Sequence, residues 1–450
     1  MPKSLTKIVF TGAVWALSIK MIGVLSSLSI NVILARILST DEMGAYFILT
    51  SLVLFGSLLA RYGIKQVVVK IVAESLANNR PGSAADAIWK MLFIITIGVM
   101  VVCSMYYLVI GRLMVIDVFD IQILENIIGV SAIWILILAY QTPLAEVFRG
   151  LHDIRLASLF DGVLFSFMLA LLLLGIWMLD LNLTFFQLID TSVFLAGFSL
   201  FVTIVILARR RVMFVGQGKT SLRNIIAISS PLFITNVINQ ILTNFSLWVA
   251  AIFLVTADVA LYGAAWKLVM LVTFPLMIVN MTVQPVISEL YTTGRYYHLQ
   301  AVLQGMATLA FIPSLLILIA FMIWSGRVLN IVYGPDYVNA ALALGILSFG
   351  QLFNAWTGSC GIVLAFTGHH DNLMKITIAT GILSMLLAVL LANQWGLTGI
   401  ALAVSIGRII HNGYAWIAVR KYTGLWTHAS FNPIFIGDAI RRVLRGDIYT

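Results

Sequence analysis

Charged residues are scarce in this chain. Asp, Glu, Lys and Arg make up 10% of its 450 residues, whereas 61% are hydrophobic. Soluble domains carry about 25% charged residues. The only two cysteines, Cys103 and Cys360, fall inside apolar runs, which argues against a disulfide framework or a metal site. The sequence also lacks HExxH and GxSxG motifs. This composition predicts an all-α polytopic membrane protein with no metal, no cofactor and no enzymatic centre.

Nucleotide binding is also disfavoured. The stretch GQGKT at 216–220 resembles the end of a phosphate-binding loop, but Met213 stands where that loop requires its first glycine. No strand precedes the stretch, which is basic and reads as a linker. Any driving force for this protein is therefore expected to come from outside the chain rather than from ATP hydrolysis.

Long apolar runs make up most of the sequence, and a membrane span needs about 20 such residues. We predict twelve transmembrane helices joined by connections too short to hold a soluble domain. Their expected ranges are 9–35, 43–64, 90–110, 126–148, 156–178, 187–208, 224–254, 260–288, 302–325, 340–367, 373–392 and 398–419.

The distribution of positive charge predicts the orientation of these spans. With the N-terminus in the cytoplasm, most of the 27 Lys and Arg residues lie on the cytoplasmic side, and only Arg36, Arg112 and Arg327 lie outside. Both termini are therefore expected to be cytoplasmic. The net charge of +9 follows from this bias and does not indicate a nucleic-acid partner.

Two pairs of similar segments suggest an internal duplication. LSTDEMGAY at 38–46 resembles LVTADVALYG at 254–263, and FRGLHD at 148–153 resembles FTGHHD at 366–371. Both pairs have nearly the same separation, which predicts two pseudo-symmetric six-helix lobes with the same orientation around a central cavity. The expected divisions are a lobe at 1–208, a basic cytoplasmic linker at 209–223, a second lobe at 224–419, and a cytoplasmic tail at 420–450.

Two stretches are expected to form amphipathic helices that lie on the cytoplasmic membrane surface. They are 65–79 and, within the tail, 434–446, where apolar residues would lie on one side of the helix and arginines on the other.

Ionisable residues inside the predicted spans are the informative ones, because a charge near the bilayer centre costs about 3 kcal/mol on insertion scales. Lys20 lies near the middle of the first span, on a polar face that continues to Asn31. The seventh span repeats this design with Asn236, Gln240 and Asn244. We expect these faces to line a water-filled cavity.

Three further cations lie within spans. Arg408 is near the middle of the twelfth, and no acid is expected at the depth of Arg408 or of Lys20. Lys267 either reaches the outer surface or faces the cavity. Arg61 either reaches the lipid headgroups, pairs with Asp161 or contacts substrate. Such a cationic cavity favours anions, and a diphosphate suits Lys and Arg donors.

Two acids complete the set of intramembrane charges. Asp161 lies toward the cytoplasmic end of the fifth span, and Glu146 lies close to that end of the fourth. Glu146 is either an interface residue or a proton relay. Both are candidates for coupling transport to an ion.

The opening of the chain resembles a known family. A first span ending in LARIL, followed by STDEMGAYFILTSL and RYGIKQVVVKIVAE, is similar to Wzx-type polysaccharide flippases of the multidrug/oligosaccharidyl-lipid/polysaccharide (MOP) superfamily. The resemblance implies translocation of undecaprenyl-diphosphate-linked oligosaccharide across the bacterial inner membrane by alternating access. It further implies that Lys20, Lys267 and Arg408 are the cations of the cavity.

Several alternatives remain at this point. A multidrug exporter of the same superfamily would need acids at the midplane, and a membrane glycosyltransferase or polymerase would need a larger outer loop. A passive scramblase or a structural subunit stays open. A monomer that works beside polysaccharide polymerases or glycosyltransferases is expected, whereas the glycan and the coupling ion cannot be predicted.

Overall fold

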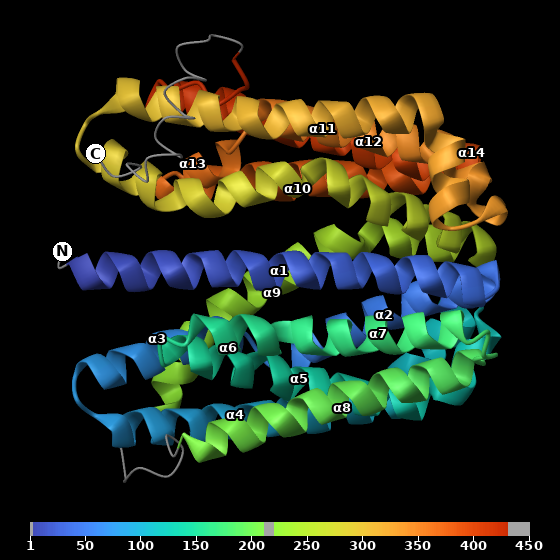
Figure 1. Cartoon of the computed structure of the whole chain (residues 1–450), viewed down its shortest axis with the longest axis horizontal. Coiled ribbons are helices and arrows are strands. Elements are labelled where there is room, and N and C mark those ends of the chain that lie inside the picture. The colour runs from blue at the N-terminus through green and yellow to red at the C-terminus, as the bar shows by residue number, and fades with distance from the viewer. Residues whose placement is uncertain (1–2, 211–219, 431–450) are drawn as a thin grey trace. The chain divides into compact units, whose positions relative to one another are not determined.

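The structure is a computed structural model that describes residues 3–210 and 220–430 (Figure 1). Within these ranges all regular structure is helical and no β-strand occurs. The amphipathic helix predicted at 434–446, and residues 211–219 of the predicted linker, lie outside the described residues.

Eleven helices of the described ranges are long and apolar enough to cross a membrane. The longest, α14 (His370–Thr423), is interrupted at Gly396, where φ is 54° and ψ is −132°. Glycine adopts this conformation readily because it has no Cβ atom. The kink falls between the predicted eleventh and twelfth spans, so the structure confirms an all-α fold with twelve spans.

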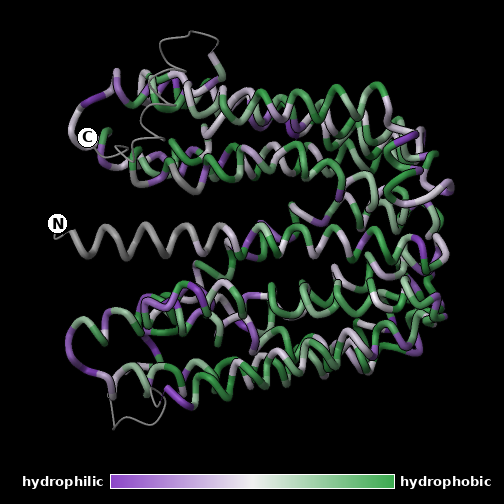
Figure 2. Tube along the Cα trace, viewed as in Figure 1, coloured by the Kyte–Doolittle hydropathy of each residue, from purple (hydrophilic) through white to green (hydrophobic). Residues whose placement is uncertain are grey.

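The chain forms two compact units, residues 1–244 and residues 245–450. The break between them falls inside α9 (Leu222–Phe253), whereas the predicted division lies in the linker at 209–223. In Figure 2, hydrophilic residues gather toward the helix ends of each unit, whereas hydrophobic residues fill the middle of the helices.

The first unit contains the start of α9 and twelve preceding elements. These are α1 (Lys3–Ile37), α2 (Thr40–Ala60), α3 (Ile64–Ala77), α4 (Pro81–Met105), η1 (Tyr106–Ile110), η2 (Leu113–Val118), η3 (Gln122–Ile127), α5 (Ile128–Gly150), α6 (Ile154–Ser158), η4 (Leu159–Val163), α7 (Leu164–Met178) and α8 (Phe185–Arg209). The second unit holds the end of α9 and α10 (Thr256–Thr292), α11 (Tyr296–Val332), η6 (Pro335–Ala340), α12 (Ala341–Thr357), α13 (Cys360–Phe366) and α14.

The repeated segments occupy corresponding helix junctions in the two units. The first pair begins α2 and α10, with Asp41 and Asp258 in the first helical turn, where a negative charge complements the helix dipole. Ser39 caps α2 and forms a capping box with Glu42. The second pair joins α5 to α6 and α13 to α14. These matched positions support an internal duplication.

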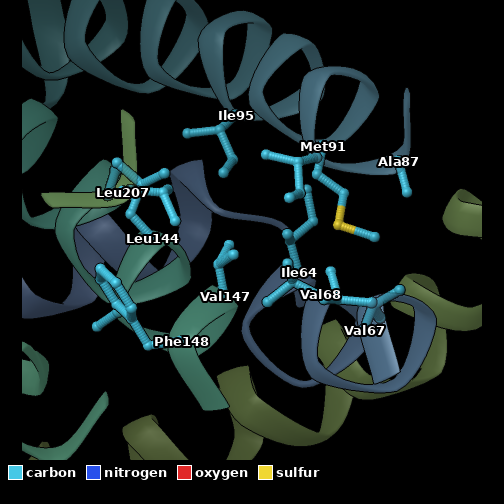
Figure 3. Packing of buried hydrophobic residues seen from close by; sticks show 14 of the residues in the cluster. Ile64, Val67, Val68, Ala87, Met91, Ile95, Leu144, Val147, Phe148 and Leu207 are labelled. Atoms are coloured by element: carbon cyan, nitrogen blue, oxygen red, sulfur yellow. The ribbon is translucent and has the colours of Figure 1, made fainter. Parts of the chain in front are cut away.

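The helix expected on the membrane surface at 65–79 is instead part of a protein core. Ile64, Val67 and Val68 of α3 are buried against α4, α5 and α8 (Figure 3). The prediction was wrong because one apolar helix face looks the same in sequence whether lipid or protein covers it.

A sharp corner at residues 61–63 directs α3 into this core. Tyr62 and Gly63 both have positive φ, 46° and 73°. The start of α9 lies against the corner, where Tyr62 stacks on Phe233 with ring centroids 4.7 Å apart. A Cβ atom on Gly63 would lie 2.5 Å from the Ser229 carbonyl oxygen, so this packing requires glycine.

The second unit is closed by a segment that follows its last helix. Residues 424–430, the strap, run beside the break between α12 and α13 at Gly358, where φ is 72°. Thr427 Oγ1 donates to the Thr357 carbonyl at 2.8 Å, and the Ala429 amide donates to the Trp356 carbonyl at 2.8 Å. The strap thus provides donors for two carbonyls at the end of α12.

Replacing Gly98 with alanine is expected to destabilise the first unit. A Cβ atom there would lie 2.1 Å from the Ala60 carbonyl oxygen, so α4 would have to move away from the end of α2. Overpacking of this kind costs about 1–3 kcal/mol. Thermal unfolding in detergent should show a lower midpoint for Gly98→Ala. Gly175→Ala is the control because nothing lies within 4 Å of its new methyl group. Equal midpoints for the two variants would contradict this packing.

The strap should undock as the pH falls. His428 Nδ1 accepts a hydrogen bond from Trp416 Nε1 at 3.2 Å, and burial lowers the pKa of His428. A histidine whose pKa is lowered on docking stabilises the docked state above about 6.5, its ordinary pKa, and this stabilisation is lost as the pH falls below that value.

Amide hydrogen exchange of residues 424–430, corrected for intrinsic rates, should therefore be faster at pH 5.5 than at pH 7.5. His428→Asn keeps an acceptor without a titratable group and should remove the pH dependence. A wild-type strap that is equally protected at both pH values would contradict the account.

Candidate functional site

Both predicted intramembrane acids belong to one charged cluster in the first unit. Lys65 Nζ lies 3.0 Å from both carboxylate oxygens of Asp161 and 3.7 Å from Glu146 Oε1. Arg149 Nη1 lies 3.2 Å from Glu146 Oε2, and Arg61 interacts electrostatically with Asp161. The side chain of Glu146 is 2% exposed, whereas those of Lys65 and Asp161 are 31% and 29% exposed. The cluster therefore joins a buried acid to one that water can reach.

A kink in the fifth span carries Asp161. Asp161 and Gly162 have non-helical backbone angles inside η4, with φ of 95° at Gly162. The preceding carbonyl, that of Phe160, accepts a hydrogen bond from Gln141 Nε2 at 2.7 Å. Gln141 also donates to Thr203 Oγ1 at 3.1 Å. The buried Gln141 side chain of α5 thus provides a donor for the backbone carbonyl beside the kink. A backbone group inside a membrane needs such a partner from the protein.

Lys20 is exposed on α1 and forms no salt bridge within the described ranges. A Cβ atom on Gly23 would lie 2.9 Å from Val163, and α1 runs parallel to α6 and α7 (Figure 1). At a helical rise of about 1.5 Å per residue, Lys20 and Asp161 are within about one turn in height. The expectation of no acid at the depth of Lys20 was therefore wrong, because the sequence does not show how α1 packs against α7.

The predicted polar residues differ in their surroundings. Asn31 is buried and its Nδ2 donates to the Ser27 carbonyl at 2.5 Å. Asn236 is half-buried and exchanges two hydrogen bonds of 3.3 Å with Gln66 of α3. Asn244 Nδ2 donates to the Gln240 carbonyl at 3.0 Å. In the described structure, Asn236 therefore contacts α3, whereas Asn31 and Asn244 bond within their own helices.

The second unit carries the other two predicted cations. Lys267 of α10 and Arg408 of α14 are half-buried, and neither forms a salt bridge in the part of the chain that the structure describes. Arg408 interacts electrostatically with the buried Tyr262 and with His411. The His411 Nδ1 atom lies 3.1 Å from Thr380 Oγ1.

Four charged or aromatic residues of these clusters escaped prediction: Lys65, Arg149, Tyr262 and His411. Lys65 was placed at the start of the helix expected on the cytoplasmic membrane surface at 65–79, whereas α3 packs into the core, and Arg149 was counted only as a cytoplasmic cation. Tyr262 and His411 lie inside apolar runs without a motif. The one available signal was the spacing of Arg408, His411 and Asn412, which places three polar side chains on one face of the last helix.

No group of three His, Cys, Asp or Glu residues that could hold a metal ion occurs among residues 3–210 and 220–430. The cluster around Lys65 consists of Lys, Arg and carboxylate groups, and the cluster around Arg408 consists of Arg, phenol and imidazole groups. Their chemistry is recognition of charge and exchange of protons.

Comparison with known proteins defines the class. The chain belongs to the family of polysaccharide biosynthesis proteins, whose pattern it matches over residues 9–291. It is 22% identical over 174 residues to the probable low-salt glycan biosynthesis flippase Agl15 of Haloferax volcanii. That match covers 37% of this chain and 36% of Agl15. The family and this relative confirm the resemblance to polysaccharide flippases and agree with a transporter rather than an enzyme.

Solved structures define the fold. An inward-facing multidrug resistance transporter of the MATE family and MOP superfamily aligns with a TM-score of 0.69 and 17% identity, covering 91% of this chain and 99% of its own. The lipid II flippase MurJ in an inward closed conformation aligns with a TM-score of 0.61 and 12% identity, covering 97% and 91%. This chain is therefore a multi-pass membrane protein with the fold of the MOP superfamily.

Removing the amide of Gln141 should destabilise the first unit. In Gln141→Met, the Phe160 carbonyl loses its side-chain donor in a buried setting, which costs about 1–3 kcal/mol. Thermal unfolding in detergent should show a lower midpoint. Ser166→Ala is the matched control, because it removes a half-buried hydroxyl that donates to the Gly162 carbonyl at the same kink. A Gln141→Met midpoint no lower than that of the control would show that the kink needs no donor from α5.

Proposed function

We propose that this protein is a flippase for lipid-linked oligosaccharide in the bacterial inner membrane. Its substrate is an undecaprenyl-diphosphate-linked repeat unit of O-antigen or another surface polysaccharide, which it moves from the cytoplasmic to the periplasmic leaflet. Membership of the polysaccharide biosynthesis family and the likeness to Agl15 support this class of substrate. The distribution of Lys and Arg supports cytoplasmic termini.

The proposal depends on which intramembrane charges form salt bridges. Lys20, Lys267 and Arg408 lie in membrane-spanning helices without a salt bridge in the described ranges, whereas Asp161 and Glu146 are paired with cations. A cation that stays charged in a membrane needs an anionic partner or water. A diphosphate supplies negative charge and several acceptor oxygens for such groups.

In the proposed cycle, the two lobes alternate between inward-open and outward-open states around a central cavity. Lys20, Arg61, Lys267 and Arg408 bind the diphosphate there. Asn31, Asn236, Gln240 and Asn244 supply polar contacts to the cavity. The lipid tail stays in the bilayer while the headgroup crosses.

We further propose that Asp161 and Glu146 couple this cycle to an ion. Glu146 is buried and Asp161 is partly exposed, and both lie within reach of Lys65. The protein is proposed to act as a monomer beside polysaccharide polymerases and glycosyltransferases.

A multidrug exporter is the second candidate, because MATE transporters share the fold. An exporter of cationic drugs needs acids that are available to the drug. Here both predicted intramembrane acids already pair with Lys65 or Arg149, which favours an anionic substrate. A glycosyltransferase or polymerase is disfavoured by the absence of a catalytic motif in the sequence.

Neutralising a cavity cation should slow transport. Lys20→Ala and Arg408→Ala each remove a charge that would face the diphosphate, and a charge-assisted hydrogen bond is worth about 1.5–3 kcal/mol, so initial rates should fall roughly tenfold or more. The measurement is flipping of fluorescent undecaprenyl-diphosphate-linked oligosaccharide in proteoliposomes. Lys20→Arg should retain most activity.

Lys70→Ala is the control for loss of a lysine, because Lys70 is exposed on α3 and pairs with Glu74 at 3.9 Å. It should flip at the wild-type rate. If Lys20→Ala and Arg408→Ala both flip at that rate with normal reconstitution, the cationic cavity is not the substrate site.

A further inference from the structure

A groove runs along three helices of the second unit. Twelve residues of α11, α12 and α14 line it, and its volume is about 730 Å³. All three helices are labelled in Figure 1 and belong to membrane-spanning segments. We propose that the groove binds one acyl chain of a phospholipid whose phosphate pairs with Arg327. No residue of its lining belongs to the site of the proposed function, and the inference does not depend on what the protein transports.

The lining of the groove suits a hydrocarbon chain. It contains no ionisable side chain, and only Ser325 and Ser405 carry a polar side chain. Ser405 Oγ donates to the Ile346 carbonyl at 2.8 Å, so this hydroxyl already has a partner inside the protein. Because that bond joins α14 to α12 within the lining, the groove is held in shape before any ligand arrives, as ligand sites usually are.

The middle of the groove is open because α12 has a glycine there. A Cβ atom on Gly345 would have nothing within 4 Å. Met322, Leu342 and Phe349 line the same groove and are exposed. Apolar atoms beside an empty space lose the van der Waals contacts that a close neighbour provides. A lipid chain in the groove supplies those contacts.

The length of the groove matches one leaflet of a bilayer. On α12 its lining extends from Ala341 to Phe349, which is about 12 Å at a helical rise of about 1.5 Å per residue. A bilayer has a hydrocarbon core about 30 Å thick, so one leaflet contributes about 15 Å. Ala341 directly follows η6, at the beginning of α12. The groove therefore extends from near one membrane surface toward the midplane, and in the orientation proposed above this leaflet is the outer one.

Residues near the surface end of the groove suit a phosphate headgroup. Trp324 is exposed and interrupts α11 with φ of −122° and ψ of 23°, and tryptophan is enriched at membrane–water interfaces. Arg327 lies two residues beyond Ser325, about 3 Å along the helix. Arg327 is exposed and forms no salt bridge in the described ranges, either with Asp336 of η6 or with another acid. A guanidinium group binds phosphate oxygens in pairs.

A second copy of the chain is a poorer occupant than a lipid. Stable protein interfaces use about 20–30 residues on each side, whereas twelve residues line this groove. The groove thus has the dimensions of a site for one chain rather than of a protein interface.

Photo-crosslinking of the full chain in proteoliposomes tests the site. The probe is a phosphatidylglycerol that carries a diazirine in one acyl chain. Labelling should be higher at residues 321–325 and 341–349 than on other membrane-spanning helices. Gly345→Leu places a side chain in the groove and should lower labelling there to the level of those helices. Gly175→Leu is the matched control, because nothing lies within 4 Å of a Cβ atom at that position either, and it should label as wild type does.

Competition with unlabelled lipids identifies the headgroup and the chain. Phosphatidylglycerol should compete with the probe, and a diacylglycerol with the same chains should compete roughly tenfold more weakly because it has no phosphate. Arg327→Gln should remove this difference. Stronger competition by undecaprenyl phosphate than by phosphatidylglycerol would assign the groove to a polyprenyl chain and overturn the proposal.

Two further results would overturn it. One is equal labelling of all membrane-spanning helices, which would mean that lipid contacts the groove without a specific site. The other is a stable dimer in native mass spectrometry that Gly345→Leu dissociates. If Gly345→Leu does not fold, Leu342→Trp, at an exposed position of the same lining, should lower labelling in the same way. None of these readouts involves transport, so they decide the lipid site whether or not the protein proves to be a flippase.

Discussion

The lack of hydrogen-bonding water in the bilayer interior is the constraint on which this structure depends. Each backbone polar group inside it needs a partner from the protein, so a break in a helix must be accompanied by a donor or a close backbone contact. At the kink of the fifth span, Gln141 supplies that donor to the Phe160 carbonyl. At the end of α12, the strap supplies Thr427 Oγ1 and the Ala429 amide. Each of these helix breaks is therefore stabilised by specific hydrogen bonds from another part of the chain.

The same constraint separates the charges into two classes. In the first unit, Asp161 pairs with Lys65, and Glu146 pairs with Lys65 and Arg149. This pairing lowers the cost of keeping the two carboxylates away from bulk water. Lys20, Lys267 and Arg408 form no such pairs in the described ranges, although all three lie in membrane-spanning helices. Our proposals assign the unpaired cations to an anionic lipid headgroup and the paired acids to coupling. In these proposals the paired acids couple transport to an ion, and the cations without a salt bridge in the described ranges bind the substrate.

The sequence was sufficient to predict the architecture. Apolar runs longer than a bilayer span and repeated segments depend on local composition, which the chain shows directly. The twelfth span was visible because the sequence between 392 and 398 turns polar around Gly396. The burial of α3 in a protein core could not be predicted, because either protein or lipid can cover the same apolar helix face.

Pairing between distant side chains was harder to predict. Lys65 follows an apolar run and reads as a cytoplasmic residue, yet the positive φ angles at Tyr62 and Gly63 turn it toward Asp161, 96 positions away in the chain. Likewise, the packing of Gly23 against Val163 sets Asp161 beside the part of α1 that carries Lys20, which the sequence alone does not reveal. Charged residues inside apolar runs can be picked out from the sequence as candidates. The residues they pair with depend on the backbone geometry of the folded chain.

The central claim is that the cations recognise a diphosphate on a lipid-linked glycan. Its most direct test compares two lipids in proteoliposomes that contain the wild-type protein. One is undecaprenyl-diphosphate-linked oligosaccharide, and the other carries the same glycan on undecaprenol without the diphosphate. The account predicts flipping of the first lipid and background rates for the second. Equal flipping of both lipids, or transport of cationic drugs with no flipping of either lipid, would contradict it.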